Sequence, residues 1–213
     1  METEDTSPKN SSSPETDGMN TTRAPGNEML SFVWEVIKFF VLALIIVLPI
    51  RIFIAQPYLV NGDSMVPTFH NGNYLIVDQL TYRFEDPERG DVAVFRLPEN
   101  STRFLIKRII GLPGETLRIE RGVITIFKDG REALTLDESF LETPYRDTLS
   151  ATLKDDEYFV MGDNRGVSYD SRVWGALPKN FLVGRPIVRL FPVREAALLP
   201  GKINYEENAQ KEI

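Results

Sequence analysis

The sequence of 213 residues contains no cysteine and only one histidine, His70. The missing thiols exclude disulfide bonds, thiolate metal sites and cysteine nucleophiles, and one histidine is too few for a His/Cys metal cluster. The net charge is −7, and no basic stripe that would suit nucleic acid is present. We therefore expect no metal, no organic cofactor and no nucleic-acid partner.

The first residues have almost no large apolar side chains. Residues 1–28 are rich in Ser, Thr, Asn, Pro and Glu, and residues 1–31 contain six acidic but only two basic side chains. Such a segment cannot bury enough apolar surface to offset the entropy lost on ordering, which predicts a disordered acidic tail over 1–28. A polar C-terminal tail is predicted over 201–213.

A long apolar segment follows the acidic tail. Residues 32–55 are nearly all apolar, and 24 residues in a helix would extend about 36 Å, enough to cross a bilayer. Lys38 can extend its amine toward an interface, and Trp34 is typical of an interfacial position. We predict one transmembrane anchor over 30–55; a buried core helix is the alternative interpretation.

Beyond residue 56 the sequence changes to short runs of Val, Ile, Leu, Tyr and Phe separated by Gly, Pro, Asp and Asn. This pattern predicts a mainly β domain over 56–200, with a twisted antiparallel sheet or barrel-like form. Gly122 and Asp129-Gly130 are hairpin turn signals, and about 112–157 is predicted to be an inserted β subdomain. The predicted strands are 57–60, 73–78, 91–96, 103–110, 116–120, 123–127, 158–161 and 186–191.

One serine is placed as a nucleophile would be. Ser64 lies in the turn-rich stretch 60-VNGDSMVPTFHNGN-73, where a serine can point outward from a bend. It needs a base, and His70 precedes an Asn-Gly turn signal with no evident carboxylate partner. Lys107 is the alternative, because apolar residues flank it and a lysine becomes a base near neutral pH only when it is buried. A turn serine and an edge-strand lysine remain the simpler interpretations of these residues.

A third polar cluster follows an apolar run at 158–161. The stretch 162-GDNRGVSYDSR-172 contains two acids, two arginines and two serines. It is either a solvated loop or a paired network that braces a site.

Taken together, three segments resemble the motifs of bacterial type I signal peptidases, membrane-bound serine proteases that remove signal peptides. The resemblance spans about residues 34–192 and includes an N-terminal anchor directly before the serine. The three segments, in the order of the family, are Ser64-Met65-x-Pro67-Thr68, Lys107 to Glu115 in the sequence KRIIGLPGE, and Gly162 to Arg172 in the pattern GDNRxxSxDSR.

The resemblance implies a role for several residues. Ser64 would be the nucleophile, and its backbone N–H would donate to the oxyanion. Lys107, kept neutral by desolvation, would be the general base and then the general acid. Ser168 would hydrogen-bond and orient Lys107. Asp170 and Arg172 would form a supporting pair, and Asp163 and Arg165 are further members of the same motif.

The resemblance also implies the substrate. Family members cut after small residues, commonly Ala-x-Ala, with the substrate extended beside a strand. The residues expected to line the shallow apolar pockets are Tyr58, Val60, Met65, Leu105 and Ile106. Gly62 is a departure, since some members have a serine there whose hydroxyl completes the oxyanion hole.

Further expectations follow for partners and location. The partners would be preprotein signal peptides and the lipid bilayer, with contact to the secretion machinery. The protein would be a single-pass protein of the bacterial cytoplasmic membrane, with its N-terminus in the cytoplasm and its catalytic domain on the outer face.

Three alternatives remain at this level. A self-cleaving Ser/Lys autoprotease has a related β fold, but the acidic tail and apolar segment differ from the DNA-binding domain expected in front of one. A Ser/His peptidase would need His70 as its base. A catalytically inactive, membrane-tethered β binding module would keep all three motifs without using them.

Overall fold

A computed structural model describes residues 25–49, 55–142 and 145–205 of the chain. The tail predicted over 1–28 lies largely outside these residues, as do most of the C-terminal tail and the last residues of the predicted anchor. The described chain divides into two compact units, one ending at Ile45 and the other beginning at Ile46.

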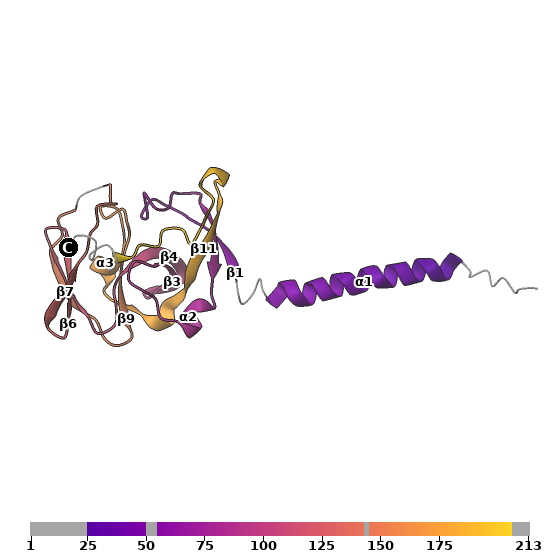
Figure 1. Ribbon diagram of the computed structural model, residues 1–213, viewed down its shortest axis with the longest axis horizontal. Helices are drawn as coiled ribbons and strands as arrows, with labels where there is room; N and C mark the ends of the chain where they lie inside the picture. The colour runs from indigo at the N-terminus through magenta and orange to yellow at the C-terminus, as the bar shows by residue number, and fades with distance from the viewer. Residues whose placement is uncertain (1–24, 50–54, 143–144, 206–213) are drawn as a thin grey trace, which may run out of the picture. The chain divides into compact units, whose positions relative to one another are not determined.

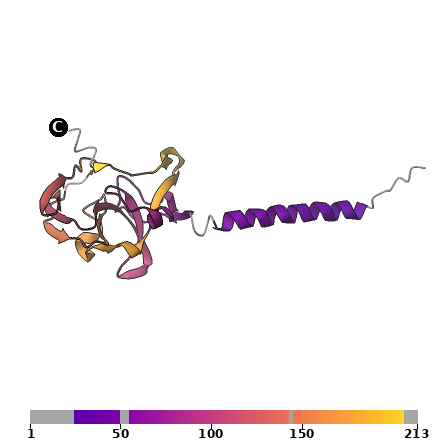
Figure 2. The same cartoon turned by 60° about the horizontal axis from the view of Figure 1, so that its bottom comes forward.

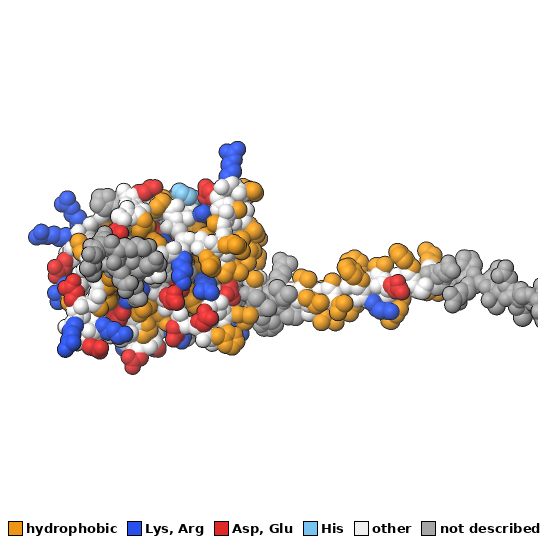
Figure 3. Space-filling model, viewed as in Figure 1, with side chains coloured by type: hydrophobic (Ala, Val, Ile, Leu, Met, Phe, Trp, Pro, Cys, Tyr) orange, Lys and Arg blue, Asp and Glu red, His pale blue; other side chains and the backbone are white. Residues whose placement is uncertain are grey.

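The first unit is built on helix α1, Pro25–Pro49. Its stretch Met29–Leu48 is long and apolar enough to cross a membrane, and none of it is buried by the rest of the structure. Apolar side chains cover most of the face of α1 drawn in Figure 3. A helix of this length and apolar composition is typical of a membrane span.

The second unit is mainly antiparallel β-sheet, as predicted, with only short helices (Figure 1). The short α-helices are α2 (Thr81–Phe84) and α3 (Ser171–Trp174). The strands are β1 (Ala55–Leu59), β2 (Tyr74–Asp78), β3 (Val92–Leu97), β4 (Asn100–Gly111), β5 (Thr116–Glu120), β6 (Val123–Lys128), β7 (Arg131–Thr135), β8 (Leu149–Thr152), β9 (Glu157–Met161), β10 (Leu177–Pro178), β11 (Leu182–Phe191) and β12 (Ala197–Leu198).

Two sheets share these strands. The larger sheet has the order β1-β2-β11-β3-β4-β9-β10, with β12 paired to β11. The smaller sheet has the order β7-β6-β5-β8 and lies within the range predicted for an inserted subdomain. Figures 1 and 2 show β6 and β7 at one end of this unit and β1 and β11 at the opposite end.

Burial explains why the two sheets have different sequences. Five of the six residues of β3 are buried, so this central strand is almost continuously apolar. In β5 and β6, buried and more exposed residues alternate, as expected for a sheet with one face toward the core. Both predicted hairpin turns are present, and both residues of each turn have a positive φ, as type I′ turns require.

Within the described part of the chain, two strands of the larger sheet, β1 and β4, have no partner strand along all or part of one edge. Among the described residues, β1 pairs with β2 and no strand lies along its other edge. β4 pairs with β9 only from Arg108 to Gly111, so its first eight residues, Asn100 to Lys107, have no described partner strand on that side. An extended segment could pair with such edges close to the predicted site.

Candidate active site

Ser64 and Lys107 meet in the structure although 43 residues separate them. Nζ of Lys107 lies 2.5 Å from Oγ of Ser64, within hydrogen-bond distance. Ser64 comes from the turn-rich segment between β1 and β2, and Lys107 from the middle of β4. His70, by contrast, is exposed, so the structure favours the lysine as the partner of Ser64.

The surroundings of Lys107 favour its neutral form. Only 2% of the residue is exposed. Burial lowers the pKa of Lys107 from 10.5 to about 8, with Asp170 and Asp163 opposing the shift and Arg103 and Arg172 adding to it. A hydroxyl and a largely desolvated amine in contact can exchange a proton near neutral pH.

The three sequence motifs meet directly behind this pair. Arg108 donates to both carboxylate oxygens of Asp163, at 2.8 and 2.6 Å, and both side chains are fully buried. Thr68 donates to Asp163 and accepts from Arg108 at 3.1 Å. One residue from each motif therefore contributes to a single buried cluster. The sequence motifs include Thr68 and Arg108, but no role was predicted for either residue.

The loop between β9 and α3, residues 162–170, packs against Ser64. The backbone N–H of Asn164 donates to the Ser64 carbonyl oxygen at 3.0 Å. A methyl group on Gly162 would lie 2.4 Å from that oxygen and 2.2 Å from Oγ of Ser168. Only glycine therefore fits between Ser64 and Ser168 without displacing one of them.

Asp170 and Arg172 form the predicted pair. Arg172 donates to both oxygens of Asp170, at 2.9 and 2.8 Å, and Asp170 accepts from the Gly162 N–H at 3.0 Å. Burial raises the pKa of Asp170, but hydrogen bonding and charge from Arg172 outweigh that effect, so the pKa is lowered and the carboxylate stays ionised. The pair fixes the end of the β9–α3 loop.

Ser168 differs from expectation. Its side chain contributes to the lowered pKa of Asp170. However, its buried Oγ has no hydrogen bond of good geometry to any described residue, so the expected bond to Lys107 is not formed. The reason is local, because the hydroxyl packs against Gly162, 2.2 Å from the position that a β-carbon of that residue would occupy.

A small cleft adjoins Ser64 and Lys107, between the end of β1 and the part of β4 that precedes Arg108. Its volume is about 110 Å³, and it includes Ser64 and Lys107. Four of the predicted substrate-binding residues line it: Tyr58, Val60, Leu105 and Ile106. Sequence reasoning missed its other lining residues, Leu59, Asn61, Leu75, Val94 and Phe104.

The prediction for Met65 was wrong. Met65 is 1% exposed and packs in a core cluster with Val60, Phe69 and Leu75, and it does not line the cleft. In the turn after Ser64 its side chain is directed inward, where an apolar residue stabilises the segment that carries the serine. Gly62, the departure from the family pattern, is exposed and has a φ of +92°, a conformation that a serine rarely adopts.

Comparisons with known proteins identify the family of the chain. The sequence profile described as signal peptidase, peptidase S26, matches residues 33–191. A probable signal peptidase I-1 of Synechocystis is 37% identical over 168 residues, covering 76% of this chain and 84% of the relative. Signal peptidase I P of Bacillus subtilis subsp. natto is 35% identical, covering 74% and 88%.

A signal peptidase I from Enterococcus faecalis, known from a crystal structure, is 28% identical with a TM-score of 0.41 and covers 47% of this chain and 97% of that one. The profile match and the similarity to signal peptidases over three quarters of the chain establish the family, and α1 provides the single-pass membrane anchor. The chain belongs to the signal peptidase family, peptidase S26, and its activity is the removal of signal peptides from preproteins by serine-type chemistry.

Proposed function

We propose that Ser64 is the nucleophile of this peptidase and that Lys107 is its general base. The observation that carries the proposal is the 2.5 Å distance between Nζ and Oγ, with the lysine only 2% exposed. With a pKa of about 8, roughly a tenth of Lys107 is neutral at pH 7. A neutral Nζ can accept the proton of the Ser64 hydroxyl.

The first half of the reaction forms an acyl-enzyme. Ser64 Oγ attacks the carbonyl carbon of the scissile peptide bond while Nζ of Lys107 takes the hydroxyl proton. The Ser64 backbone N–H donates to the oxyanion of the tetrahedral intermediate. As the carbon–nitrogen bond breaks, the Lys107 ammonium gives its proton to the leaving amine, and the signal peptide stays bound to Ser64 as an ester.

The second half releases the signal peptide. Water attacks the ester carbonyl while neutral Lys107 takes a proton from it, and the same proton returns to Oγ when the ester bond breaks. Asp170 and Arg172 support both halves by fixing the loop behind Ser64. Ser168 is kept as a supporting residue, because its buried hydroxyl lies in the same loop, against Gly162, and its side chain contributes to the lowered pKa of Asp170.

The substrate would bind as an extra strand. The outer edge of β1 and the part of β4 before Arg108 flank the cleft, and an extended segment can hydrogen-bond to strand edges. The apolar walls from Tyr58, Val60, Leu105 and Ile106 leave about 110 Å³, which suits small side chains. We therefore propose cleavage after Ala-x-Ala sequences.

The proposed orientation places the N-terminal tail in the cytoplasm and the catalytic unit on the outer face. Family membership and the single apolar helix support it. Because the chain has no cysteine, an introduced one is the only thiol. Lys128→Cys in intact cells should react with a membrane-impermeant maleimide, and Ser12→Cys should react only after lysis. The reverse result would contradict this orientation.

The test of the dyad is cleavage of a preprotein by the full chain in detergent micelles, with the cut mapped by mass spectrometry. We expect a single cut after a small residue. Ser64→Ala should abolish it, whereas the matched control His70→Ala should cleave at the wild-type rate. Persistent cleavage by Ser64→Ala, or its loss in a folded His70→Ala variant, would show that the assignment is wrong.

A further inference from the structure

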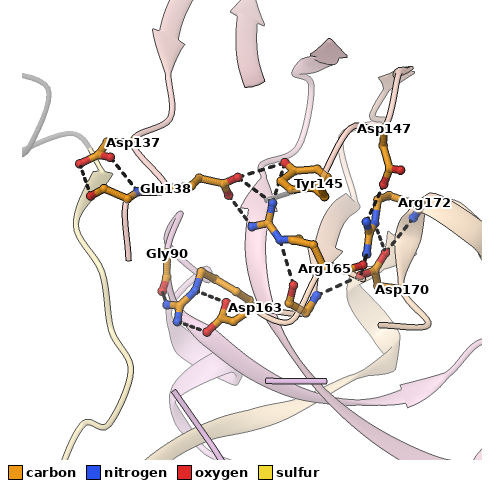
Figure 4. A network of polar contacts seen from close by, with 12 residues as sticks. Gly90, Asp137, Glu138, Tyr145, Asp147, Asp163, Arg165, Asp170 and Arg172 are labelled. Carbon is orange, nitrogen blue, oxygen red and sulfur yellow. Dashed lines mark hydrogen bonds and ion pairs between the residues drawn. The ribbon is translucent and has the colours of Figure 1, made fainter. Parts of the chain in front are cut away.

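The described parts of the segment between β7 and β8, residues 136–142 and 145–148, contact the β9–α3 loop (Figure 4). The first residue of the segment, Leu136, is buried in a core cluster that the smaller sheet shares with β4 and β9, and Tyr145 packs against the same cluster. A methyl group on Gly122, in the β5–β6 turn, would lie 2.2 Å from the Tyr145 carbonyl oxygen, so the segment is closely packed on its own sheet. Leu136 and Tyr145 therefore anchor the segment through packing contacts as well as through its polar contacts.

Two acids of this segment bind the two arginines of the β9–α3 region. Glu138 forms a two-pronged ion pair with Arg165, one contact being 2.7 Å, and the Arg165 side chain is fully buried. Asp147 accepts from Arg172 at 2.6 Å. Figure 4 shows Arg165 between Glu138 and Tyr145, and Arg172 between Asp147 and Asp170. The segment between β7 and β8 therefore holds both arginines, in addition to the contacts that they make within the β9–α3 region.

Tyr145 joins the two ion pairs. Its hydroxyl accepts from Arg165 at 2.7 Å and donates to Glu138 at 3.0 Å. Its ring centroid lies 4.9 Å from the Arg165 guanidinium carbon and 5.7 Å from that of Arg172, within the range of cation–π attraction. A single aromatic side chain therefore contacts both guanidinium groups.

Arg165 transmits this contact to Ser64. Its Nε donates to the Gly162 carbonyl oxygen at 2.9 Å, and Gly162 is the residue pressed between Ser64 and Ser168. The Arg165 carbonyl oxygen accepts from Arg172 at 2.7 Å, which closes the loop on itself. A buried guanidinium that loses its carboxylate has a large desolvation penalty, so removing Glu138 should release Arg165 and loosen Gly162.

We propose that Glu138 and Tyr145 are positioning residues, which hold the β9–α3 loop against the Ser64–Lys107 pair through Arg165. The smaller sheet is then part of the catalytic apparatus, although it contributes no atom to the cleft. This inference rests on the proposed dyad.

The proposal has a consequence for Lys107. The charged groups that act on it are Asp163 and Asp170 from the loop, Arg103 from β4 and Arg172 from α3, and burial is the largest influence. A loosened loop admits water to Lys107, and hydration raises the pKa of a buried lysine. The acid limb of the rate profile should therefore move to higher pH.

The experiment compares four variants of the full chain in detergent micelles, with a synthetic signal-peptide substrate ending its signal segment in Ala-x-Ala. For Glu138→Gln we expect kcat to fall roughly tenfold to a hundredfold, because small displacements of a reacting pair have effects of this size. KM should stay within about twofold of the wild-type value, and the acid limb of the pH–rate profile should move about half a pH unit higher. Tyr145→Phe keeps the ring but loses the hydroxyl. Its kcat should fall only a few-fold, with KM and the acid limb changing as in Glu138→Gln.

The matched control is Glu115→Gln. Glu115 forms a buried, two-pronged pair with Arg89, comparable in burial to the Glu138–Arg165 pair, and neither partner contacts the β9–α3 loop. It should lower the melting temperature as much as Glu138→Gln does, yet leave kcat and the pH profile of the folded protein unchanged.

The proposal requires the fall in kcat and the shift of the acid limb together. A Glu138→Gln variant that only melts earlier, or changes only KM, or loses kcat without the pH shift, would overturn it. Ser64→Ala in the same assay separates the two levels. If that variant is inactive and Glu138→Gln behaves as wild type, the dyad stands and the positioning role fails; if Ser64→Ala still cleaves, the dyad itself is wrong.

Discussion

Lys107 and Arg108 are consecutive cations of β4, and both are buried, yet their surroundings are opposite. Arg108 donates to Asp163, to Thr68 and to the carbonyl oxygens of Gly90 and Gly201. Among the described residues, the side-chain amine of Lys107 makes its polar contact with Ser64, and no carboxylate pairs with it directly. Successive side chains of a strand point to opposite faces, so one strand presents the two cations to two different environments.

The difference separates a structural cation from a reactive one. A guanidinium does not lose its proton in proteins, so a buried one must be fully paired, as Arg108 is. A buried amine without a carboxylate partner can become neutral instead, and its lowered pKa makes it a base. If a carboxylate paired with Lys107 and none paired with Arg108, the protein would lose both its activity and its stability.

Replacing Lys107 should have the largest effect on activity. Lys107→Met should lower kcat/KM by roughly 10⁴-fold or more, as loss of a member of a catalytic unit does. The same change should stabilise the fold. Because the pKa of Lys107 is lowered from 10.5 to about 8, the unfolded chain binds more protons between these pH values, and the penalty is fully present below pH 8.

We therefore expect Lys107→Met to raise the free energy of unfolding by about 1–3 kcal/mol at pH 7. The gain should shrink as the pH rises from 8 to 10.5, because the wild-type lysine is then neutral in the folded state. Thermal denaturation in detergent at pH 7 and pH 10 measures both effects. A destabilised variant at pH 7 would show that Lys107 is held as a paired charge.

Replacing Arg108 should have the opposite effect on stability. Arg108→Met leaves Asp163 buried without its guanidinium, which should lower the free energy of unfolding by about 3–5 kcal/mol. A double variant, Arg108→Met with Asp163→Leu, should recover much of the loss because no uncompensated charge remains. Urea denaturation of the wild type, the two single variants and the double variant tests this, and additive losses in the double variant would argue against the pairing.

A variant at Gly162 tests whether the β9–α3 loop matters more for the reactive pair of Ser64 and Lys107 than for the structural contacts of Arg108. Gly162→Ala introduces a methyl group 2.2 Å from Ser168 Oγ and 2.4 Å from the Ser64 carbonyl oxygen. We expect a loss of about 1–3 kcal/mol in stability and a larger proportional loss in kcat. Gly166→Ala in the same loop is the control, since nothing lies within 4 Å of its added methyl group. Equal behaviour of the two variants would contradict the close packing.

Local features of the fold were predictable. Gly122 and Asp129-Gly130 identified two hairpins because the residue types that tolerate positive φ are few. The Ser64–Lys107 pair was anticipated from motif resemblance together with the apolar neighbours of Lys107. Strands β7 and β8 were missed, since they are short, lie at the edges of the smaller sheet and belong to the polar stretch 129–157.

Long-range polar contacts were not predictable. Nothing in the local sequence of Glu138, Tyr145 or Asp147 indicates that they contact Arg165 and Arg172, because ion pairs between distant segments leave no periodic pattern. The contact of Thr68 with Arg108 and Asp163 was missed for the same reason. Met65 was misplaced because an apolar residue beside a nucleophile fits a pocket wall and a core equally well.

The most direct test of the account is the pH dependence of kcat/KM for signal-peptide cleavage by the full chain in detergent. A lysine base acts when deprotonated, so the rate should rise with pH and level off above an apparent pKa of about 8. The limb should be absent from the residual activity of Lys107→Ala. A rate that keeps rising toward about 10.4, the pKa of a free lysine, would contradict a desolvated Lys107 as the base.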